Sequence, residues 1–529
     1  MTRLESAAVA RAATTLADLD GEARRARFRV LQERMGSVWH SMKLDFDDES
    51  VIVVPSVTLS TAVPGSGSMA QAFEERFLFL LLLLRQPRLR MVYVTSMPID
   101  QRIIEYYLAL LPGVIPSHAL ARLSMVSVGD SSPRPLSEKL LERPRMLARI
   151  AALVPNRAHS HLIPYNTTEL ERDIALTLGV PMYGADPRLS GLGTKTGCRR
   201  LFGEVGVPYP LGAEDLHGLD DVVDAIGELL TRRPGMSQAI VKLNEGVSGA
   251  GNALVDLVGI ADLPAPDRRA TIAERVRGMQ LESPDTPFEA YVAKLESDGG
   301  IVEERIIGEG LLSPSVQLRA LPDGTVELLS THDQLLGGAS GQSYLGCTFP
   351  ADPAYSRLIS EPAMAIGERL AAEGVLGRFA VDFVVVRDAA GEWSAYAIEL
   401  NLRKGGTTHP FLTLQFLTDG RYDQESGRYV TPDGAEKHLV ATDHLEAVEL
   451  RGLSVGDLFD VVARHGLHYD QSRQSGIVFH MISCITEHGR VGMTAVGDTP
   501  AQAMELYERA RRVLLDEATV GGMESTLPE

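Results

Sequence analysis

The chain has 529 residues, of which 44% are hydrophobic and 23% are charged, and this composition excludes a mostly disordered or fibrous protein. At roughly 100–200 residues per domain, the length predicts about three domains. The 51 Lys and Arg residues against 70 Asp and Glu residues give a net charge of −19, which argues against nucleic acid as a partner because that partner needs a basic face.

The cysteines and the hydropathy of the chain indicate in which cellular compartment the protein is expected. Cys198, Cys347 and Cys484 lie far apart and form neither a metal-ligand spacing nor a disulfide framework. The N-terminal 30 residues contain no apolar stretch typical of a signal peptide. The most apolar run, residues 77–84, is far shorter than the roughly 20 residues that span a bilayer. We therefore expect a cytoplasmic protein with structural thiols, a buried helix at this run and no membrane partner.

The first 190 residues alternate strand-like and helical segments. Apolar runs begin at Val51, Met91 and Leu123, and helical stretches at residues 70–85 and 101–111 lie between them. This alternation predicts an α/β domain with a parallel sheet and crossover helices. Ligands bind at the carboxyl ends of such strands, so the small-residue segment 64–69 could contact a substrate, although a plain flexible turn is the preferred interpretation.

The pattern changes near residue 190. Thr194 is placed to cap a helix over residues 195–205, which Gly206 ends, and a second helix is predicted over residues 220–231. A strand at 239–244 then leads into a glycine-rich loop. Residues 288–401 are predicted to be mostly strands with short loops.

The C-terminal part is predicted to begin with an exposed polar loop or linker over residues 418–440. Two strand-like runs follow, 476–485 and 489–497, and a helix begins at Thr499-Pro500. We therefore expect domains at 1–190, 191–415 and 416–529, the second with lobes at 191–290 and 291–415.

The strongest local signal is a predicted hairpin over residues 381–406. If its loop is the four residues 389–392, Asp382 lies opposite Glu399, and alternation places Asn401 on the same face. Two carboxylates facing each other repel, so the arrangement makes sense if a cation lies between them. Carboxylate and amide oxygens suit Mg²⁺ that bridges to phosphate. An ordinary hairpin with a wet polar face is the alternative.

A second signal is the strand carrying Lys242, which runs into the glycine-rich loop 244–251. Small residues let backbone N–H groups approach phosphate oxygens, and a lysine adds charge. The loop matches neither the P-loop pattern nor a GxGxxG turn, and a flexible hairpin tip is the alternative.

Two weaker signals flank this loop in the sequence. Lys195, at a helix start, reads by itself as a solvent-exposed charge. Residues 300–310 read as a strand with acidic residues that could bind adenine and ribose, or as a charged edge strand.

The order of these signals resembles the ATP-grasp superfamily over roughly residues 190–415, and the segment AIELNLRKGG resembles its Glu-x-Asn-x-Arg signature. The resemblance implies an ATP-grasp core of the α+β type, ATP and Mg²⁺, with two ions expected. It implies that Lys195 and Lys242 hold the phosphates. It implies nucleotide-loop roles for Glu245, Gly246, Ser248, Gly249 and Gly251.

The same resemblance implies further roles near the adenine, the metal and the transferred phosphate. Glu303 and Glu304, with the backbone of Arg305 and Ile306, match the adenine hinge, and Glu309 matches the ribose carboxylate. Asp382, Glu399 and Asn401 match the magnesium ligands. The implied catalytic residues are Arg403, Arg378 and Lys242.

A narrower resemblance, to the pheganomycin-type peptide ligases, extends over nearly the whole chain, with an N-terminal pre-grasp α/β domain and a small C-terminal domain. It rests on SPSVQLRALPDG, STHDQLLGG, YLGCTFPA and the C-terminal strands. We expect the acyl site along residues 330–346, with these candidate residues: Thr331, His332, Asp333, Gln334 and Tyr344. His332 could deprotonate the amine or be a hydrogen-bonded core histidine. His409 carries the same two readings, and His480 is expected to pack in the core.

The implied reaction is ATP-dependent joining of a small carboxylate to an amine or peptide through an acyl phosphate, with release of ADP and phosphate. Two alternatives stay open on the sequence: a kinase that phosphorylates a small molecule, and a non-catalytic ATP-binding regulator. A homodimer is a further expectation from the superfamily.

Overall fold

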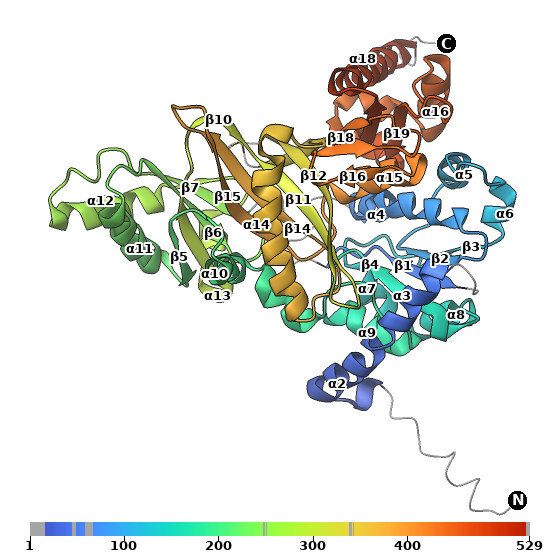
Figure 1. Ribbon diagram of the computed structural model, residues 1–529, viewed down its shortest axis with the longest axis horizontal. Helices are drawn as coiled ribbons and strands as arrows, with labels where there is room; N and C mark the ends of the chain where they lie inside the picture. Colours follow the sequence, from blue (N-terminus) through green and yellow to red (C-terminus); the bar gives the residue numbers. More distant parts are fainter. Residues whose placement is uncertain are drawn as a thin grey trace, which may run out of the picture.

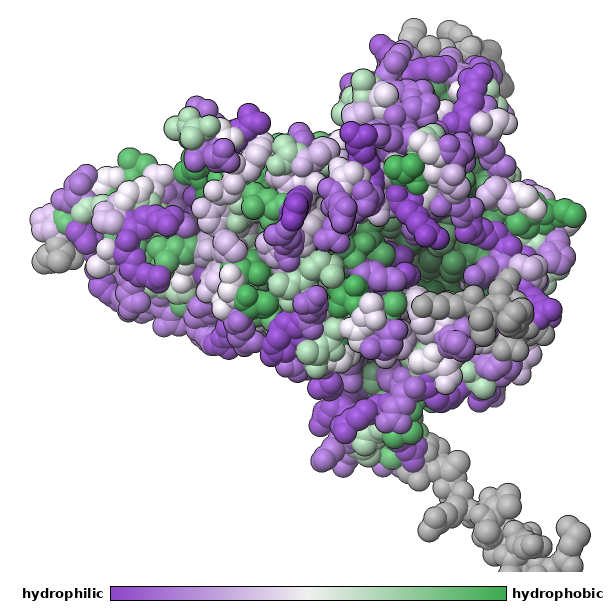
Figure 2. Space-filling model, in the orientation of Figure 1, coloured by the Kyte–Doolittle hydropathy of each residue, from purple (hydrophilic) through white to green (hydrophobic). Residues whose placement is uncertain are grey.

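The computed structural model describes residues 16–44, 49–58, 67–246, 249, 251–337, 341 and 343–524. The predicted contact at residues 64–66 and the role of Ser248 lie outside these ranges. Figure 1 shows three neighbouring parts: the lobe with α11 and α12, a central sheet with α14, and the N-terminal sheet with the C-terminal elements beside it. Hydrophilic residues predominate on the face drawn in Figure 2.

The N-terminal part is the predicted α/β domain. Its four parallel strands lie in the order β3-β2-β1-β4, with bounds β1 Ser50–Val54, β2 Arg90–Thr95, β3 Leu123–Ser127 and β4 Ser160–Pro164. The elements around them are η1 Leu16–Asp18, α2 Gly21–Gln32, α3 Met35–Leu44, α4 Gly67–Glu75, η2 Arg76–Arg85, α5 Gln101–Ala109, α6 Pro116–Leu120, α7 Leu136–Leu141, α8 Pro144–Ala152, η3 Arg157–His159, α9 Glu169–Leu178 and η4 Pro187–Gly193.

The apolar run 77–84 is buried, as predicted, within the 3₁₀ helix η2. A helix with no polar face needs apolar neighbours all round. Here it packs into a core shared with the N-terminal sheet and the C-terminal strands. Among the described residues, no helix has both the length and the apolar character required to cross a bilayer.

The next lobe is a five-stranded sheet in the order β5-β9-β6-β7-β8, with helices packed on it. Its elements are α10 Lys195–Val205, β5 Gly212–Leu216, α11 Leu219–Arg232, β6 Gln238–Leu243, β7 Asn252–Asp256, α12 Ala265–Arg277, β8 Gln280–Leu281, α13 Phe288–Asp298 and β9 Gly300–Glu304. The caps of α10 are as predicted: the Thr194 side chain accepts from Gly197 N, and Gly206 ends the helix. Strand β9 lies inside the sheet, so its reading as an edge strand is wrong.

The central sheet has nine strands. Their path is β10-β14-β11-β12-β13-β18-β20-β19, and β15 pairs with β14. The bounds are β10 Glu309–Leu312, β11 Pro314–Ala320, β12 Val326–Gly337, β13 Ser343–Phe349, β14 Gly377–Arg387, β15 Trp393–Asn401, β18 His438–Glu446, β19 Gly476–His480 and β20 Arg490–Gly497. The C-terminal strands therefore extend the same sheet rather than forming a separate one.

Two helical segments correct the expectation that residues 288–401 are mostly strands. These are α13 and the 20-residue α14, Pro353–Ala372, which buries Tyr355, Ile359, Ala363, Ile366 and Leu370 against the central sheet. The predicted polar linker also contains structure, since β16 Arg421–Asp423 pairs with β17 Arg428–Val430 and Tyr429 is buried. The remaining elements are α15 Thr408–Thr418, η5 Val448–Gly452, α16 Val455–Arg464, η6 Ile482–Cys484, α17 Ile485–His488 and α18 Pro500–Glu524.

Candidate active site

The hairpin β14–β15 places three oxygen-bearing side chains together. Asp382 pairs directly with Glu399, and Asn401 Nδ2 donates to Asp382 Oδ2 at 2.9 Å. The loop has five residues, 388–392, rather than four, and a register shift between Asp382 and Phe383 compensates for the extra residue. The predicted juxtaposition of the three side chains is confirmed, although the loop length behind it was wrong.

The two facing carboxylates have different electrostatic surroundings. Burial, and then the charge of Glu399, raises the pKa of Asp382. Burial would also raise the pKa of Glu399, but the nearby Lys195 and Arg403 outweigh it and lower that pKa. Lys195 Nζ lies 2.5 Å from Glu399 Oε1. The charge of Glu399 is thus neutralised by Lys195, and a bound cation would stabilise the ionised form of Asp382. The hard oxygen donors of this face fit Mg²⁺.

Lys195 and Lys242 are distant in sequence, and Asn244 brings their elements together. Directly after β6, the carbonyl of Asn244 accepts from Lys195 N at 3.1 Å, and its Oδ1 accepts from Thr196 N at 3.0 Å. These bonds hold the start of α10 against the end of β6. Both lysines are buried, 6% and 4% exposed, so their charges act in a medium that screens them little.

The buried acidic pair on β9 is tied to cations of the same lobe. Glu303 forms ion pairs with Lys242 and with Arg199, the latter at 3.0 Å. Glu304 pairs with Arg233 and accepts from Leu211 N at 3.0 Å. The N–H of Arg305 donates to the Gln238 carbonyl at 3.1 Å, so this backbone donor is already engaged in the lobe.

A pocket between the two lobes, here the inter-lobe pocket, brings many of the predicted residues together. Its walls carry apolar side chains from both lobes, including Ile240, Leu336, Val384 and Ile398. A planar ring fits between apolar walls of this kind. The predicted residues that line it are Lys195, Lys242, Gly246, Gly249, Gly251, Glu303, Glu304, Arg305, Ile306, Gln334, Asp382 and Glu399.

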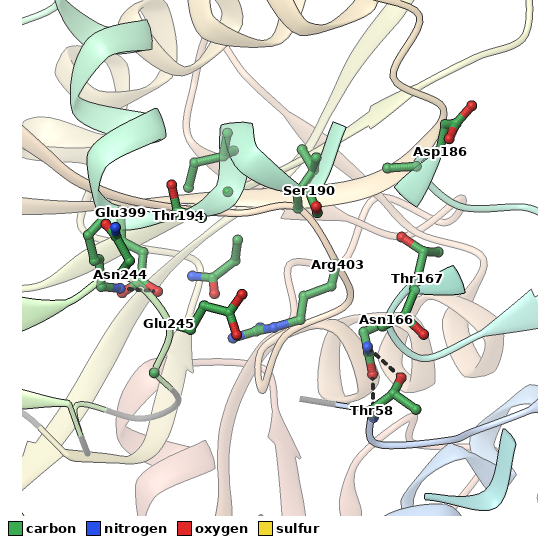
Figure 3. Close-up of a pocket in the computed structure, with 18 residues that line it drawn as sticks. Thr58, Asn166, Thr167, Asp186, Ser190, Thr194, Asn244, Glu245, Glu399 and Arg403 are labelled. Atoms are coloured by element: carbon green, nitrogen blue, oxygen red, sulfur yellow. Dashed lines mark hydrogen bonds and ion pairs between the residues drawn. The ribbon is translucent and has the colours of Figure 1, made fainter. Parts of the chain in front are cut away.

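A second pocket, here the arginine pocket, adjoins the first and shares Lys195, Gly246 and Glu399 with it. In Figure 3 the side chains of Arg403 and Glu245 point toward each other in the middle of the pocket, and Thr58, Asn166 and Thr167 lie on the right of the view. The lining residues are Thr58, Asn166, Thr167, Thr168, Ala185, Asp186, Ser190, Gly193, Thr194, Lys195, Asn244, Glu245, Gly246, Glu399, Leu400, Asn401, Leu402 and Arg403.

Sequence reasoning missed the N-terminal wall of the arginine pocket. Thr58 and Asn166 follow β1 and β4, and they bind each other: Thr58 N donates to Asn166 Oδ1 at 3.0 Å, and Asn166 Nδ2 donates to Thr58 Oγ1 at 2.7 Å. Side chains at the carboxyl ends of adjacent parallel strands meet at one sheet edge. That rule would have indicated both residues had β4 been recognised.

Three predicted acyl-site residues lie away from both pockets. Thr331 Oγ1 is 2.8 Å from the Tyr422 hydroxyl, and Asp333 accepts from Tyr355 OH at 2.7 Å. His332 is fully buried between Phe349 and Phe411, with Nε2 2.9 Å from Ser330 Oγ, and burial lowers its pKa to about 3. These contacts correct the expectation for all three. His332 is a core histidine rather than a base.

Three further predicted residues do not line either pocket. Glu309 is exposed on β10, and Tyr344 is partly buried beside Gly406. Burial lowers the pKa of Arg378 to about 10, and its side chain lies near Tyr183. Of the two predicted catalytic arginines, Arg403 lines the second of these pockets and Arg378 lines neither.

The three thiols are free and buried. Burial raises the pKa of Cys198 to about 11 and the pKa values of Cys347 and Cys484 to about 12. Neutral thiols of this kind are poor nucleophiles, which agrees with the structural role predicted for Cys198 and Cys347.

Two lobes that enclose a pocket with paired lysines on one side and an acidic hairpin on the other define the ATP-grasp class of protein. The comparisons agree. Residues 189–281 and 286–425 match the family described as "IQCH-like, ATP-grasp", and residues 457–510 match the "PGM1 C-terminal domain".

Curated relatives extend the similarity over most of the chain. The chain is 30% identical over 453 residues to the L-propargylglycine–L-glutamate ligase of Streptantibioticus cattleyicolor, covering 83% of this chain and 89% of that protein. It is 22% identical to IQ motif-containing protein H of Danio rerio, covering 83% of this chain but only 46% of that protein. The chain belongs to the ATP-grasp ligases.

Solved structures support the fold. A biotin carboxylase–β,γ-ATP complex from Campylobacter jejuni superposes with a TM-score of 0.51 at 12% identity, covering 90% of this chain and 96% of that one. The biotin carboxylase domain of the Hydrogenobacter thermophilus 2-oxoglutarate carboxylase gives 0.51 at 11% identity, covering 89% and 94%.

Proposed function

We propose that the protein uses ATP to join a small carboxylic acid to an amine, through an acyl phosphate and with release of ADP and phosphate. The observation that carries this proposal is the meeting of Lys195, Lys242, Asp382 and Glu399 around the inter-lobe pocket, next to a second pocket that contains Arg403. The two pockets share Lys195 and Glu399, so a reacting phosphoryl group at their junction is within reach of both.

ATP would occupy the inter-lobe pocket. Its adenine would lie between the apolar walls contributed by Ile240, Leu336 and Ile398, near Glu304 and Ile306. The triphosphate would extend toward Lys242 and Lys195, whose buried charges attract phosphate oxygens strongly. Gly246, Gly249 and Gly251 would let the loop backbone approach the phosphates.

Asp382, Glu399 and Asn401 would hold magnesium, and we propose two ions, as the acidic hairpin offers two carboxylates. When bound, Mg²⁺ would neutralise the charge of the phosphate oxygens. The residues of the chain perform the other tasks. Lys195 would exchange Glu399 for phosphate, and Arg403 would orient the attacking carboxylate and stabilise the negative charge that develops on the transferred phosphoryl group.

The acid and the amine would enter through the arginine pocket. Its wall of hydroxyl and amide groups, Thr58, Asn166, Thr167 and Thr168, suits polar substrates. The S. cattleyicolor relative is by name a ligase of two amino acids. We therefore propose amino acids or short peptides as the substrates, with the N-terminal wall reading their polar groups.

The test is ADP release by the purified full-length protein, with ATP, Mg²⁺ and a panel of amino-acid pairs. A ligase releases ADP and phosphate only when acid and amine are both present, and mass spectrometry finds the amide. Lys242→Ala and Glu399→Ala should abolish the signal, while Lys294→Ala, on α13 and outside both pockets, should preserve it. A phosphorylated product without free phosphate would show a kinase instead. Near-normal rates in both site variants would refute this active site.

A further inference from the structure

Two imidazoles and a carboxylate converge in the core, away from both pockets. His409 Nε2 lies 3.1 Å from His480 Nε2, His480 Nε2 lies 2.7 Å from Asp443 Oδ1, and His409 Nε2 lies 3.2 Å from the same oxygen. The three residues are only 3–4% exposed. They come from three different elements, α15, β18 and β19, so only the tertiary fold brings these atoms together.

Hydrogen bonds alone do not account well for the three short contacts among His409 Nε2, His480 Nε2 and Asp443 Oδ1. Each neutral imidazole carries one proton, and the carboxylate carries none, so at most two protons serve three short contacts. If both Nε2 atoms are protonated, two N–H groups face each other at 3.1 Å. If only one is protonated, a nitrogen lone pair faces a carboxylate oxygen. When His409 is the histidine without the Nε2 proton, its proton is on Nδ1, which has no hydrogen-bond partner in the described part of the chain.

A cation resolves the conflict, because all three atoms then offer lone pairs to it. Ligands about 2.1 Å from a metal and at right angles to one another are about 3.0 Å apart. The observed separations of 2.7–3.2 Å match one face of such an octahedron. Two imidazoles and one carboxylate are a donor set for Zn²⁺ and similar divalent transition metals, unlike the all-oxygen set of the acidic hairpin.

We propose that His409, Asp443 and His480 are three ligands of a buried structural site for a divalent transition metal, with Zn²⁺ as the metal used to test it. The site is separate from the proposed nucleotide site and does not depend on the proposed ligase activity. A metal bound there would link α15, which follows the β14–β15 hairpin, to strands β18 and β19.

The surroundings support a built site. Arg76 Nη1 binds Asp443 Oδ2 at 2.5 Å, which leaves Oδ1 directed at the imidazoles, and Arg490 Nε donates to the Asp443 carbonyl at 2.7 Å. Outer partners of this kind fix a ligating carboxylate. Gly492 pairs with His480 across β19–β20, and a Cβ at that position would collide with the imidazole. The positive charge of Arg76 opposes a second cation, so we expect weaker binding than in an uncharged surrounding.

The experiment measures Zn²⁺ binding to the metal-stripped full-length protein in excess Mg²⁺ and without nucleotide. We expect one bound Zn²⁺ per chain and a higher thermal midpoint, both lost in His480→Gln. Two matched controls should keep both: His332→Gln, which changes another buried histidine, and Glu399→Gln, which changes the proposed magnesium site.

If His480→Gln does not fold, the Co²⁺-loaded wild-type protein gives the answer. Its NMR spectrum should contain paramagnetically shifted imidazole resonances from two histidines. The proposal is overturned if the folded wild-type protein binds no Zn²⁺ under these conditions, if His480→Gln binds it unchanged, or if cobalt shifts no histidine resonance.

Discussion

Lys195 and Glu399 form an ion pair, with Nζ 2.5 Å from Oε1, that joins the first residue of α10 to strand β15 of the central sheet. Lys242 is likewise paired with Glu303. Each lysine proposed to bind phosphate therefore already has a carboxylate partner. Triphosphate and magnesium would replace these contacts together: phosphate would take the carboxylate's place on Lys195, and Mg²⁺ would take the lysine's place on Glu399. Nucleotide and metal should consequently bind in a coupled manner.

The first prediction concerns this ion pair. Lys195→Met and Glu399→Gln should each lower ADP formation about 10²–10³-fold, because each removes a charge from the proposed transition state. Since the two residues are in contact, the double variant should lose less than the product of the single losses. Steady-state ADP release measures this, with Lys294→Met as the control. Fully multiplicative losses would show that the two residues do not act together.

The second prediction concerns pH. Burial and the neighbouring Glu399 raise the pKa of Asp382 above its ordinary value, so this carboxylate takes up a proton at a higher pH than an exposed aspartate does. A protonated Asp382 cannot hold a cation well. Activity should therefore decline on the acid side of neutrality, and higher Mg²⁺ concentrations should move this decline to lower pH. A pH–rate profile at two Mg²⁺ concentrations measures this shift. A decline at acid pH that does not depend on the Mg²⁺ concentration would contradict the assignment of Asp382 as a magnesium ligand.

The sequence predicted the hairpin well because strand alternation and cross-strand pairing are local. Placing Asp382, Glu399 and Asn401 together required only the register of β14 against β15. The loop is one residue longer than assumed, and a register shift that was not foreseen restores the predicted pairing. The N-terminal wall of the arginine pocket could not be predicted in this way. Thr58 and Asn166 meet only through the order of the parallel strands, and strand β4 was not recognised.

Two other errors have physical causes. Helix α14 was read as strands, although its buried residues repeat at helical spacing; Pro362 lies inside the helix and weakens that signal. His332 was placed among the acyl-site candidates because its sequence neighbours suggested a substrate strand. Its environment depends on Phe349 and on Phe411 of α15, which lie far along the chain. Burial by distant segments is not readable from a local pattern.

The third prediction concerns Lys404, which follows Arg403. Lys404 is 5% exposed and donates to the Pro164 carbonyl at 2.6 Å, and burial, with Arg378 nearby, lowers its pKa from 10.5 to about 7. Between these values the unfolded chain binds more protons than the folded protein, so this group makes stability rise with pH. Lys404→Met removes the effect. The variant should gain thermal stability relative to wild type at pH 6 and lose that advantage by pH 10.

Thermal unfolding of both proteins across this pH range checks the prediction. The lost hydrogen bond to Pro164 shifts the variant by a similar amount at every pH, so the pH dependence of the difference isolates the charge. Lys294→Met should show no such trend. A difference that is constant with pH would contradict the lowered pKa.

The fourth prediction concerns Arg199, whose guanidinium is buried between Glu303 at 3.0 Å and Glu214 at 2.7 Å. Arg199→Met leaves the buried Glu303 with Lys242 as its remaining ion-pair partner among the described residues. Removing one partner of a buried ion pair costs about 3–5 kcal/mol. Glu303 should then hold Lys242 more closely and compete with ATP for it, so KM for ATP should rise as stability falls.

The adjacent Arg200 supplies the matched control. It lies on the same helix but is 59% exposed, and it pairs with the half-exposed Asp215. Arg200→Met should change stability by less than about 1 kcal/mol and leave KM for ATP unchanged, because exposed ion pairs contribute little. Chemical unfolding and ATP kinetics on both variants measure the contrast. Equal effects of the two substitutions would mean that Arg199 does not position Glu303 and Lys242.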